Sequence, residues 1–173
     1  MESTFDIHIN DIDAGNCDVI MRLNDKEITY WASYIGHEPI ASLITACANI
    51  NQYNDHRPYY LEWLDEPGIL EIAILLDEDQ KLHFDIYNRP EEAEATESWH
   101  EVINYDDFVV AIVNEGFRVL NSYGLQGYLN AWINDSFPIT DLLRCTLFLD
   151  GKTHFSDFSQ EIDCILSHIQ KLK

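Results

Sequence analysis

The feature that most constrains the fold is the spacing of apolar residues between positions 59 and 87. Three short apolar runs, at residues 59–64, 69–76 and 82–87, are separated only by short polar turns. Such turns can join antiparallel strands, whereas parallel strands need long crossover connections. The runs therefore predict an antiparallel meander. The nearly continuous apolar character of residues 69–76 predicts a central strand that is covered on both faces.

More strands are predicted nearer the N-terminus. Residues 5–9 alternate between apolar and polar side chains, which is typical of a strand with one buried face. Residues 17–23 and 27–35 predict a hairpin around the polar turn at residues 24–25. In contrast, residues 89–98 contain four glutamates and no large apolar residue, so we expect a mobile loop there.

Helical spacing of apolar residues follows Pro39 and returns in the last third of the chain. Pro39 suits the first position of a helix, because its missing N–H has no partner there, and this helix should end near residues 51–54. Asp106 can cap a second helix, which Gly124 should terminate in a left-handed conformation. Further helices are predicted at residues 125–132, from Pro138 to residue 143, and from a capping box of Asp157 and Gln160 to the C-terminus.

The sequence allows either a helix or a small hairpin at residues 145–155, because Asp-Gly at positions 150–151 favours a hairpin turn. The other patterns agree on one α+β domain over residues 1–173. We expect an antiparallel sheet of about five or six strands with helices packed on one side, and a C-terminal third that is mainly helical. A chain of 173 residues with 46% apolar residues can bury a core without disulfides and is not disordered.

The charge of the chain excludes several classes of function. There are 31 acidic and 10 basic residues, for a net charge of −21. Nucleic-acid binders need clustered Lys and Arg, and anionic membrane surfaces repel such a chain. No apolar run reaches the length of a transmembrane helix. Because the N-terminus also lacks the basic and apolar regions of a signal peptide, we expect a cytoplasmic protein.

No motif predicts a cofactor, a metal site or a nucleophile. Residues 11–15 begin like a calcium loop, but the glycine is one position early and Arg22 stands where a bidentate Glu is needed. No serine lies in a nucleophile elbow. Four cysteines lie far apart among apolar neighbours, which predicts buried, reduced thiols: Cys17, Cys47, Cys145 and Cys164.

The histidines leave one question open. None of the seven stands in a metal-binding motif. His8 and His83, however, lie in predicted strands, each two residues from an aspartate. They could form a metal site or an acid–base pair if the strands adjoin, although alternation alone predicts solvent-facing polar residues there. A small hydrolase or another enzyme with an unmarked carboxylate or histidine site is therefore the alternative function. It requires a concave pocket with perturbed titrating groups.

Negative charge is concentrated in the middle of the chain. From Asp65 to Glu115 the sequence has fifteen acidic and two basic residues, interleaved with tyrosine and tryptophan. Self-repulsion on this scale costs stability. Carboxylates around Tyr and Trp suit a basic protein partner. Alternatively, the aromatic residues fill the core and the acids only face solvent.

This acidic, motif-free α+β character resembles the immunity proteins of bacterial toxin–immunity pairs, including contact-dependent inhibition systems. The resemblance implies a cytosolic inhibitor that binds a basic toxin, often a nuclease, and occludes its active surface. A general acidic adaptor, a nucleic-acid mimic and adaptation to high salt are further alternatives. On the inhibitor hypothesis, with Tyr87 or Trp99 as the apolar anchor, the expected partner surface comprises Asp77, Glu78, Asp79, Tyr87, Glu91, Glu92, Glu94 and Trp99.

Overall fold

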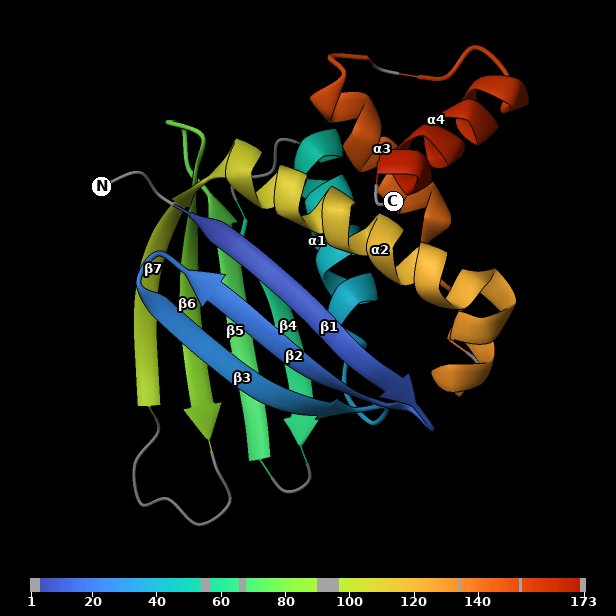
Figure 1. Ribbon diagram of the computed structural model, residues 1–173. Coiled ribbons are helices and arrows are strands. Elements are labelled where there is room, and N and C mark those ends of the chain that lie inside the picture. The colour runs from blue at the N-terminus through green and yellow to red at the C-terminus, as the bar shows by residue number, and fades with distance from the viewer. Residues whose placement is uncertain are drawn as a thin grey trace.

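The computed structural model describes residues 4–53, 57–65, 68–89, 97–133, 135–152 and 154–171. They form an antiparallel sheet followed by helices, so the α+β class and the helical C-terminal third are confirmed (Figure 1). In chain order the elements are β1 (Phe5–Asp13), β2 (Asn16–Leu23), β3 (Lys26–Ser33), α1 (Pro39–Tyr53), β4 (Tyr59–Asp65), β5 (Gly68–Leu76), β6 (Lys81–Arg89), β7 (Glu97–Asn104), α2 (Tyr105–Ala131), α3 (Ile139–Leu149) and α4 (Phe158–Lys171).

The sheet has seven strands among the described residues, rather than the five or six expected, and their order follows the chain from β1 to β7. The additional strand is β7, which begins at Glu97, inside the segment 89–98 for which the sequence predicts a loop. The alternation of apolar and polar residues along β7 is interrupted at Glu101. This polar residue pairs with the buried Phe84 and therefore takes an inward position. Residues 90–96 lie outside the described residues.

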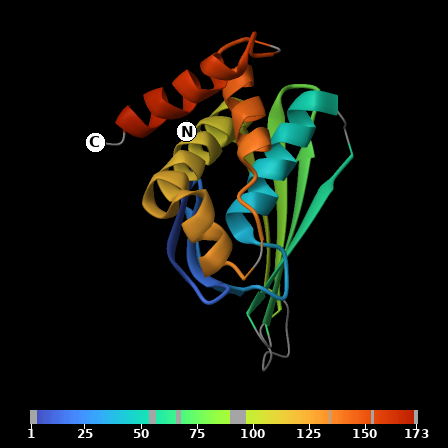
Figure 2. The same cartoon turned by 90° about the vertical axis from the view of Figure 1, so that its right-hand side faces the viewer.

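In the part of the chain that the structure describes, helices cover one face of the sheet and leave the other open (Figure 2). Along β5 the side chains alternate between buried and partly exposed positions, and Glu71, Ala73 and Leu75 are among the partly exposed ones. The expectation that residues 69–76 are covered on both faces is therefore wrong. The run reads as continuously apolar because Ile69, Ala73 and Leu75 occupy the open face, where apolar residues are tolerated.

Strands β3 and β4 separate after a brief contact. Among the described residues their register contains the single pair Ser33 and Leu64. Strands β1–β3 therefore diverge from β4–β7 and cross in front of them in Figure 1. At the other end of β3, Lys26 Nζ lies 2.9 Å from a Glu101 oxygen, so the β2–β3 turn approaches β7. The core enclosed by this curvature includes the contacting rings of Phe5, Phe84 and Phe108.

Helix α2 bends at Gly124, where φ is 64° and ψ is 171°. The left-handed glycine is as predicted, but the helix resumes after it, so the helix expected at residues 125–132 is the last part of α2. The N-terminal cap residue is Asn104 rather than Asp106, which lies in the first turn. An acid in this position still interacts favourably with the helix dipole.

Helix α3 settles the open choice at residues 145–155. It continues without a break to Leu149, and the chain then turns at Gly151, where φ is 65°. Residues 145–149 are therefore helical, and the hairpin alternative is wrong. The predicted cap of α4 is confirmed, because the Gln160 N–H donates to Asp157 Oδ1 at 3.1 Å.

Candidate functional site

Asp77 organises the 77–79 turn, which the sequence predicts as part of the partner surface. One carboxylate oxygen of Asp77 accepts hydrogen bonds from the N–H groups of Asp79 and Lys81, each at 2.9 Å. The other lies 2.8 Å from Nε2 of His83, and this contact is the main reason why the pKa of Asp77 is lowered. Glu78 and Asp79 are exposed. Asp77 thus holds the turn, while its two neighbours face solvent.

Tyr87 and Trp99 lie on opposite faces of the sheet. Trp99 pairs with Ile86, which is buried, so the indole is on the core side. Tyr87 pairs with Ser98 and is 42% exposed on the open face. The two aromatic residues therefore belong to different surfaces, and of the two only Tyr87 is on the face without helices.

Three acids of the predicted partner surface lie outside the described residues: Glu91, Glu92 and Glu94. The chain enters this segment from Arg89, at the end of β6, and leaves it at Glu97. Arg89 is the last of the nine residues of β6, and the 77–79 turn precedes the first, so about 30 Å of strand separates them. The fold therefore places the 77–79 turn far from the point where the chain enters this acidic segment.

The open face of β4–β6 carries a group of side chains that sequence analysis missed. We name it the tyrosine–glutamate surface: Tyr60, Glu62, Glu71 and Tyr87. Tyr60 is 72% exposed. Strand register places Glu62 directly opposite Glu71, and Glu71 directly opposite Tyr87. A hollow of about 260 Å³ lies among these residues and also contacts His37. No local signal identifies this group, because register between strands creates it.

Glu62 and Glu71 are like charges held side by side. Such a pair, directly opposite on one face, destabilises a sheet by about 0.2–1 kcal/mol. Arg89 Nη2 lies 2.6 Å from a Glu71 oxygen, and this partly exposed ion pair offsets part of the repulsion. Among the described residues no Lys or Arg side chain forms an ion pair with Glu62. The pair therefore keeps a net negative charge at the centre of the surface.

A second hollow, of about 400 Å³, lies between α1 and β4, and we name it the α1 pocket. It adjoins the first hollow, because His37, Tyr60 and Leu61 line both. Glu38 and Asp135 also line it. Glu38 is only 6% exposed, so an almost fully buried acidic residue borders this pocket.

Glu38 caps the N-terminus of α1. Its carboxylate accepts hydrogen bonds from the N–H groups of Ile40, at 3.2 Å, and Ala41. Burial raises the pKa of Glu38 from its usual 4.5 to about 7, with a smaller contribution from Asp135, while the hydrogen bonds oppose the shift. The Tyr128 hydroxyl also favours the ionised carboxylate. This hydroxyl is close to Glu38, but among the described residues it has no partner that meets hydrogen-bond geometry.

Two polar side chains of the α1 pocket are already engaged by neighbouring groups. Ser42 Oγ donates to the Pro39 carbonyl at 3.0 Å and accepts from Trp63 Nε1 at 3.3 Å. His37 Nδ1 accepts the N–H of Glu62 at 2.9 Å, so a neutral ring carries its proton on Nε2. These contacts fix both side chains and do not join them as a nucleophile and its base.

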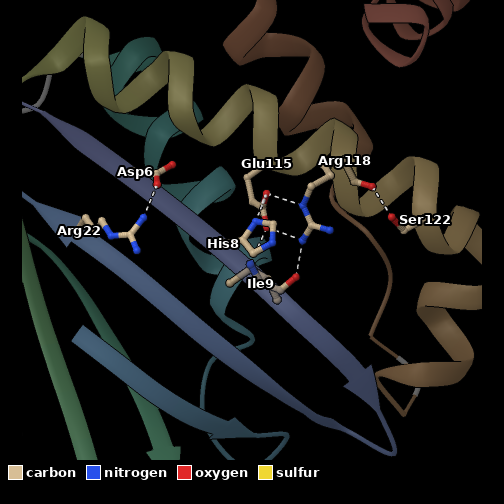
Figure 3. Close-up of polar contacts among 7 residues, drawn as sticks. All are labelled: Asp6, His8, Ile9, Arg22, Glu115, Arg118 and Ser122. Carbon is tan, nitrogen blue, oxygen red and sulfur yellow. Dashed lines mark hydrogen bonds and ion pairs between the residues drawn. The ribbon is translucent and has the colours of Figure 1, made fainter. Parts of the chain in front are cut away.

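A third polar group lies where α2 crosses β1 (Figure 3). Glu115 Oε1 accepts the N–H of Ile9 at 2.5 Å, and Arg118 donates both to the Ile9 carbonyl and to Glu115. His8 Nδ1 lies 3.5 Å from the other Glu115 oxygen. Because β1 is an edge strand, these side chains bond backbone groups that a further strand would otherwise bond. We therefore assign this group to folding rather than to binding.

The pairing of His8 with His83 that adjoining strands would allow does not occur, because β1 and β6 are not neighbours. His83 instead lies beside His100 of β7, with ring centroids 5.5 Å apart, and each ring contacts an aspartate. In the part of the chain that the structure describes, no group of three or more His, Cys, Asp or Glu side chains could hold a metal ion.

Comparison with known proteins found no matching family model, curated protein or solved structure. Within the described ranges, no helix combines the length and apolar character needed to cross a membrane. The chemistry of the two adjoining hollows is thus the basis for a functional proposal.

Proposed function

We propose that this protein is an acidic inhibitor of the immunity type, which binds a basic protein partner through the tyrosine–glutamate surface. The observation that carries the proposal is the pair Glu62 and Glu71, two carboxylates directly opposite each other on an uncovered sheet face. Their repulsion costs stability in the free protein. A lysine or arginine of a partner, placed between them, would remove that cost, so the arrangement favours a binding role.

Tyr60 and Tyr87 provide apolar contact area beside the carboxylates. They are 72% and 42% exposed, although large aromatic side chains usually pack inside a protein. Tyrosine is enriched at binding hot spots, because its ring adds area and its hydroxyl adds a hydrogen bond at a low entropic cost. The surface therefore combines the two elements that a tight complex with a cationic protein needs.

The net charge of −21 supports the same class of partner. A field of this sign attracts a basic domain over long distances at low salt and raises its association rate. A nuclease toxin is a partner of the expected kind, because it needs Lys and Arg to hold nucleic-acid phosphates. Stoichiometric binding over that basic surface would block the toxin without any chemistry by this protein.

The test is association with cationic proteins encoded beside this gene, beginning with any large secreted protein that has a basic C-terminal domain. Wild type, E62Q/E71Q and a charge-matched D13N/D18N control on β1–β2 are compared at about 50 mM salt. We expect association of E62Q/E71Q to be about tenfold slower than that of the other two. Equal rates for all three would reject this surface. Absence of binding to every cationic candidate would reject the function.

A small hydrolase or other acid–base enzyme is the second candidate, and the α1 pocket favours it. Glu38 has a pKa of about 7, which suits a general base. Against it, helix N–H groups already hold the carboxylate, and His37 is held by Glu62. The test is a panel of ester, amide and phosphodiester substrates with wild type and E38Q. A rate that E38Q loses would support the enzyme, and rates at background would exclude it for these substrates.

A further inference from the structure

The lining of the α1 pocket suits a ligand with an apolar stem and a polar end. Gly36, Ala41 and Ala46 are small, so they leave space beside α1. Tyr59 and Tyr60 add aromatic rings on the β4 side. Aromatic faces attract cations as well as apolar groups, and long cationic side chains pack their methylene groups on apolar surface. This combination is typical of a site for an organic cation.

The charges in the pocket point to the same ligand. Glu38 and Asp135 are both acidic, and none of the described residues that line the pocket is Lys or Arg. The groups that act on Glu38 from neighbouring elements are Tyr128 of α2 and Asp135, and Glu38 in turn acts on Cys17 of β2. Burial raises the pKa values of the Tyr128 hydroxyl and the Cys17 thiol, so both stay neutral. A buried carboxylate in such surroundings is stabilised strongly by a cation that enters.

Other ligand classes fit the pocket less well. Two carboxylates repel phosphates and organic acids. A bound metal ion needs several ligands, and the described residues contain no group of three that could hold one. A neutral apolar molecule would cover Glu38 and Asp135 without compensating their charges. An organic cation with a short alkyl stem does both: its charge compensates Glu38 and Asp135, and its stem covers the apolar lining.

We propose that the α1 pocket binds a guanidinium or alkylammonium group at the end of an apolar stem. In the complex this group would be an arginine or lysine side chain of the partner, and this assignment of its source rests on the proposed function. The pocket and the tyrosine–glutamate surface share His37, Tyr60 and Leu61. One partner can therefore cover the open sheet face and insert a single side chain beside α1.

The direct test measures binding of butylguanidinium and butylammonium to the free protein by NMR titration, with N-butylurea as the neutral analogue of the same shape. We expect dissociation constants on the order of 1–10 mM for the cations and at least tenfold weaker binding of N-butylurea. Equal binding of the neutral analogue would overturn the proposal, and so would no binding of either cation.

Variants locate the site. E38Q should weaken cation binding about tenfold, whereas E71Q, the matched change in the neighbouring hollow, should alter it less than twofold. D135N changes an exposed residue and should weaken binding about threefold, which keeps the test valid if E38Q fails to fold. The cations would bind elsewhere if D135N bound them as tightly as wild type and E38Q either did the same or failed to fold.

The pH dependence of cation binding gives an independent measurement on the wild-type protein. With a pKa near 7, Glu38 is mostly ionised at pH 8 and mostly protonated at pH 6. Affinity for butylguanidinium should therefore fall about tenfold between pH 8 and pH 6, and the carboxyl carbon signal of Glu38 should titrate at lower pH when the cation is bound. An affinity that is constant over this range would contradict a contact with Glu38.

The two proposals fail separately. Suppose that E62Q/E71Q slows binding of the partner but the small cations do not bind. The inhibitor proposal is then supported, and the assignment of the α1 pocket is wrong. If butylguanidinium binds and no cationic protein does, the site takes a free small amine or guanidine, and the inhibitor is wrong. If butylguanidinium competes with the partner, its source is a side chain of that partner, as proposed.

Discussion

Glu115 on α2 accepts a hydrogen bond from the backbone N–H of Ile9 on β1, which lies 106 positions earlier in the chain. Arg118, one turn further along α2, donates to the carbonyl of the same residue. The pair therefore bonds both backbone groups of an edge-strand residue. Further along, the Tyr123 hydroxyl accepts the N–H of Ile12 at 2.9 Å. Helix α2 thus covers the edge of β1 and makes it unavailable to other strands.

Glu115→Ala should destabilise the protein by about 3 kcal/mol, because it leaves the Ile9 N–H unpaired and removes the carboxylate that balances the half-buried Arg118 guanidinium. The measurement is urea unfolding followed by tryptophan fluorescence. Glu27→Ala is the control: its exposed ion pair with Arg22 should contribute about 0.5 kcal/mol or less. Similar losses in both variants would contradict the role assigned to Glu115.

Gly124→Ala should destabilise the protein by about 1–3 kcal/mol. A Cβ at Gly124 would meet nothing within 4 Å, so the cost comes from the backbone, which has φ of 64° there. Gly127 provides a matched control three residues later, in the helix that follows the bend. Gly127→Ala should be neutral or stabilise by up to about 1 kcal/mol, because alanine favours helix. The opposite order of the two unfolding midpoints would refute the explanation.

Glu62→Gln should stabilise the free protein by about 0.3–1 kcal/mol, because it removes the repulsion with Glu71. Thermal unfolding at low salt measures this, and the gain should shrink at 0.5 M salt, where the repulsion is screened. Asp18→Asn is the control, since its cross-strand partners, Asn10 and Trp31, carry no charge. A loss of stability in Glu62→Gln would mean that the pair is not repulsive.

Glu38 should make the protein less stable as the pH rises. Its pKa is about 7 in the folded state and near 4.5 when unfolded, so between these values the folded chain holds a proton that the unfolded chain has lost. Stability therefore falls from about pH 4.5 to pH 7 and levels off above, by about 3 kcal/mol in total. Urea unfolding at pH 5 and pH 8 measures most of this fall.

Glu38→Gln should lose this pH dependence, and a slope equal to that of wild type would contradict the assignment. Asp77 and Asp157 have lowered pKa values, so their stabilisation is present at higher pH and is lost only as the pH falls below their unfolded values. Measurements above pH 5 therefore separate Glu38 from both aspartates.

Local patterns predicted much of the fold. Alternation and apolar runs between short polar turns located six strands, Pro39 marked the start of α1, and Asp157 marked the cap of α4. The missed strand, β7, has Glu101 at an inward position, where Lys26 and Asn24 from the β2–β3 turn bind it. Because a distant segment provides these partners, the alternation of β7 could not be read from its own residues.

The candidate site was predicted less well than the fold. Of the tyrosine–glutamate surface, only Tyr87 was among the partner residues expected from the sequence. Tyr60, Glu62 and Glu71 were not. Glu38 was also missed, because nothing near it in the sequence indicates burial. The acidic stretch from Asp65 onward pointed to the middle of the chain without showing which of its acids lie together.

By itself the sequence determined the α+β class, most of the elements and the negative charge, because periodicity, turn residues and charge are properties of neighbouring positions. Only the tertiary structure decided that Glu62 faces Glu71 and that Glu38 lines a pocket beside Asp135. The first depends on the register between strands, and the second on how α1, α2 and β4 pack. Both arise from contacts between residues far apart in the chain, which no local pattern encodes.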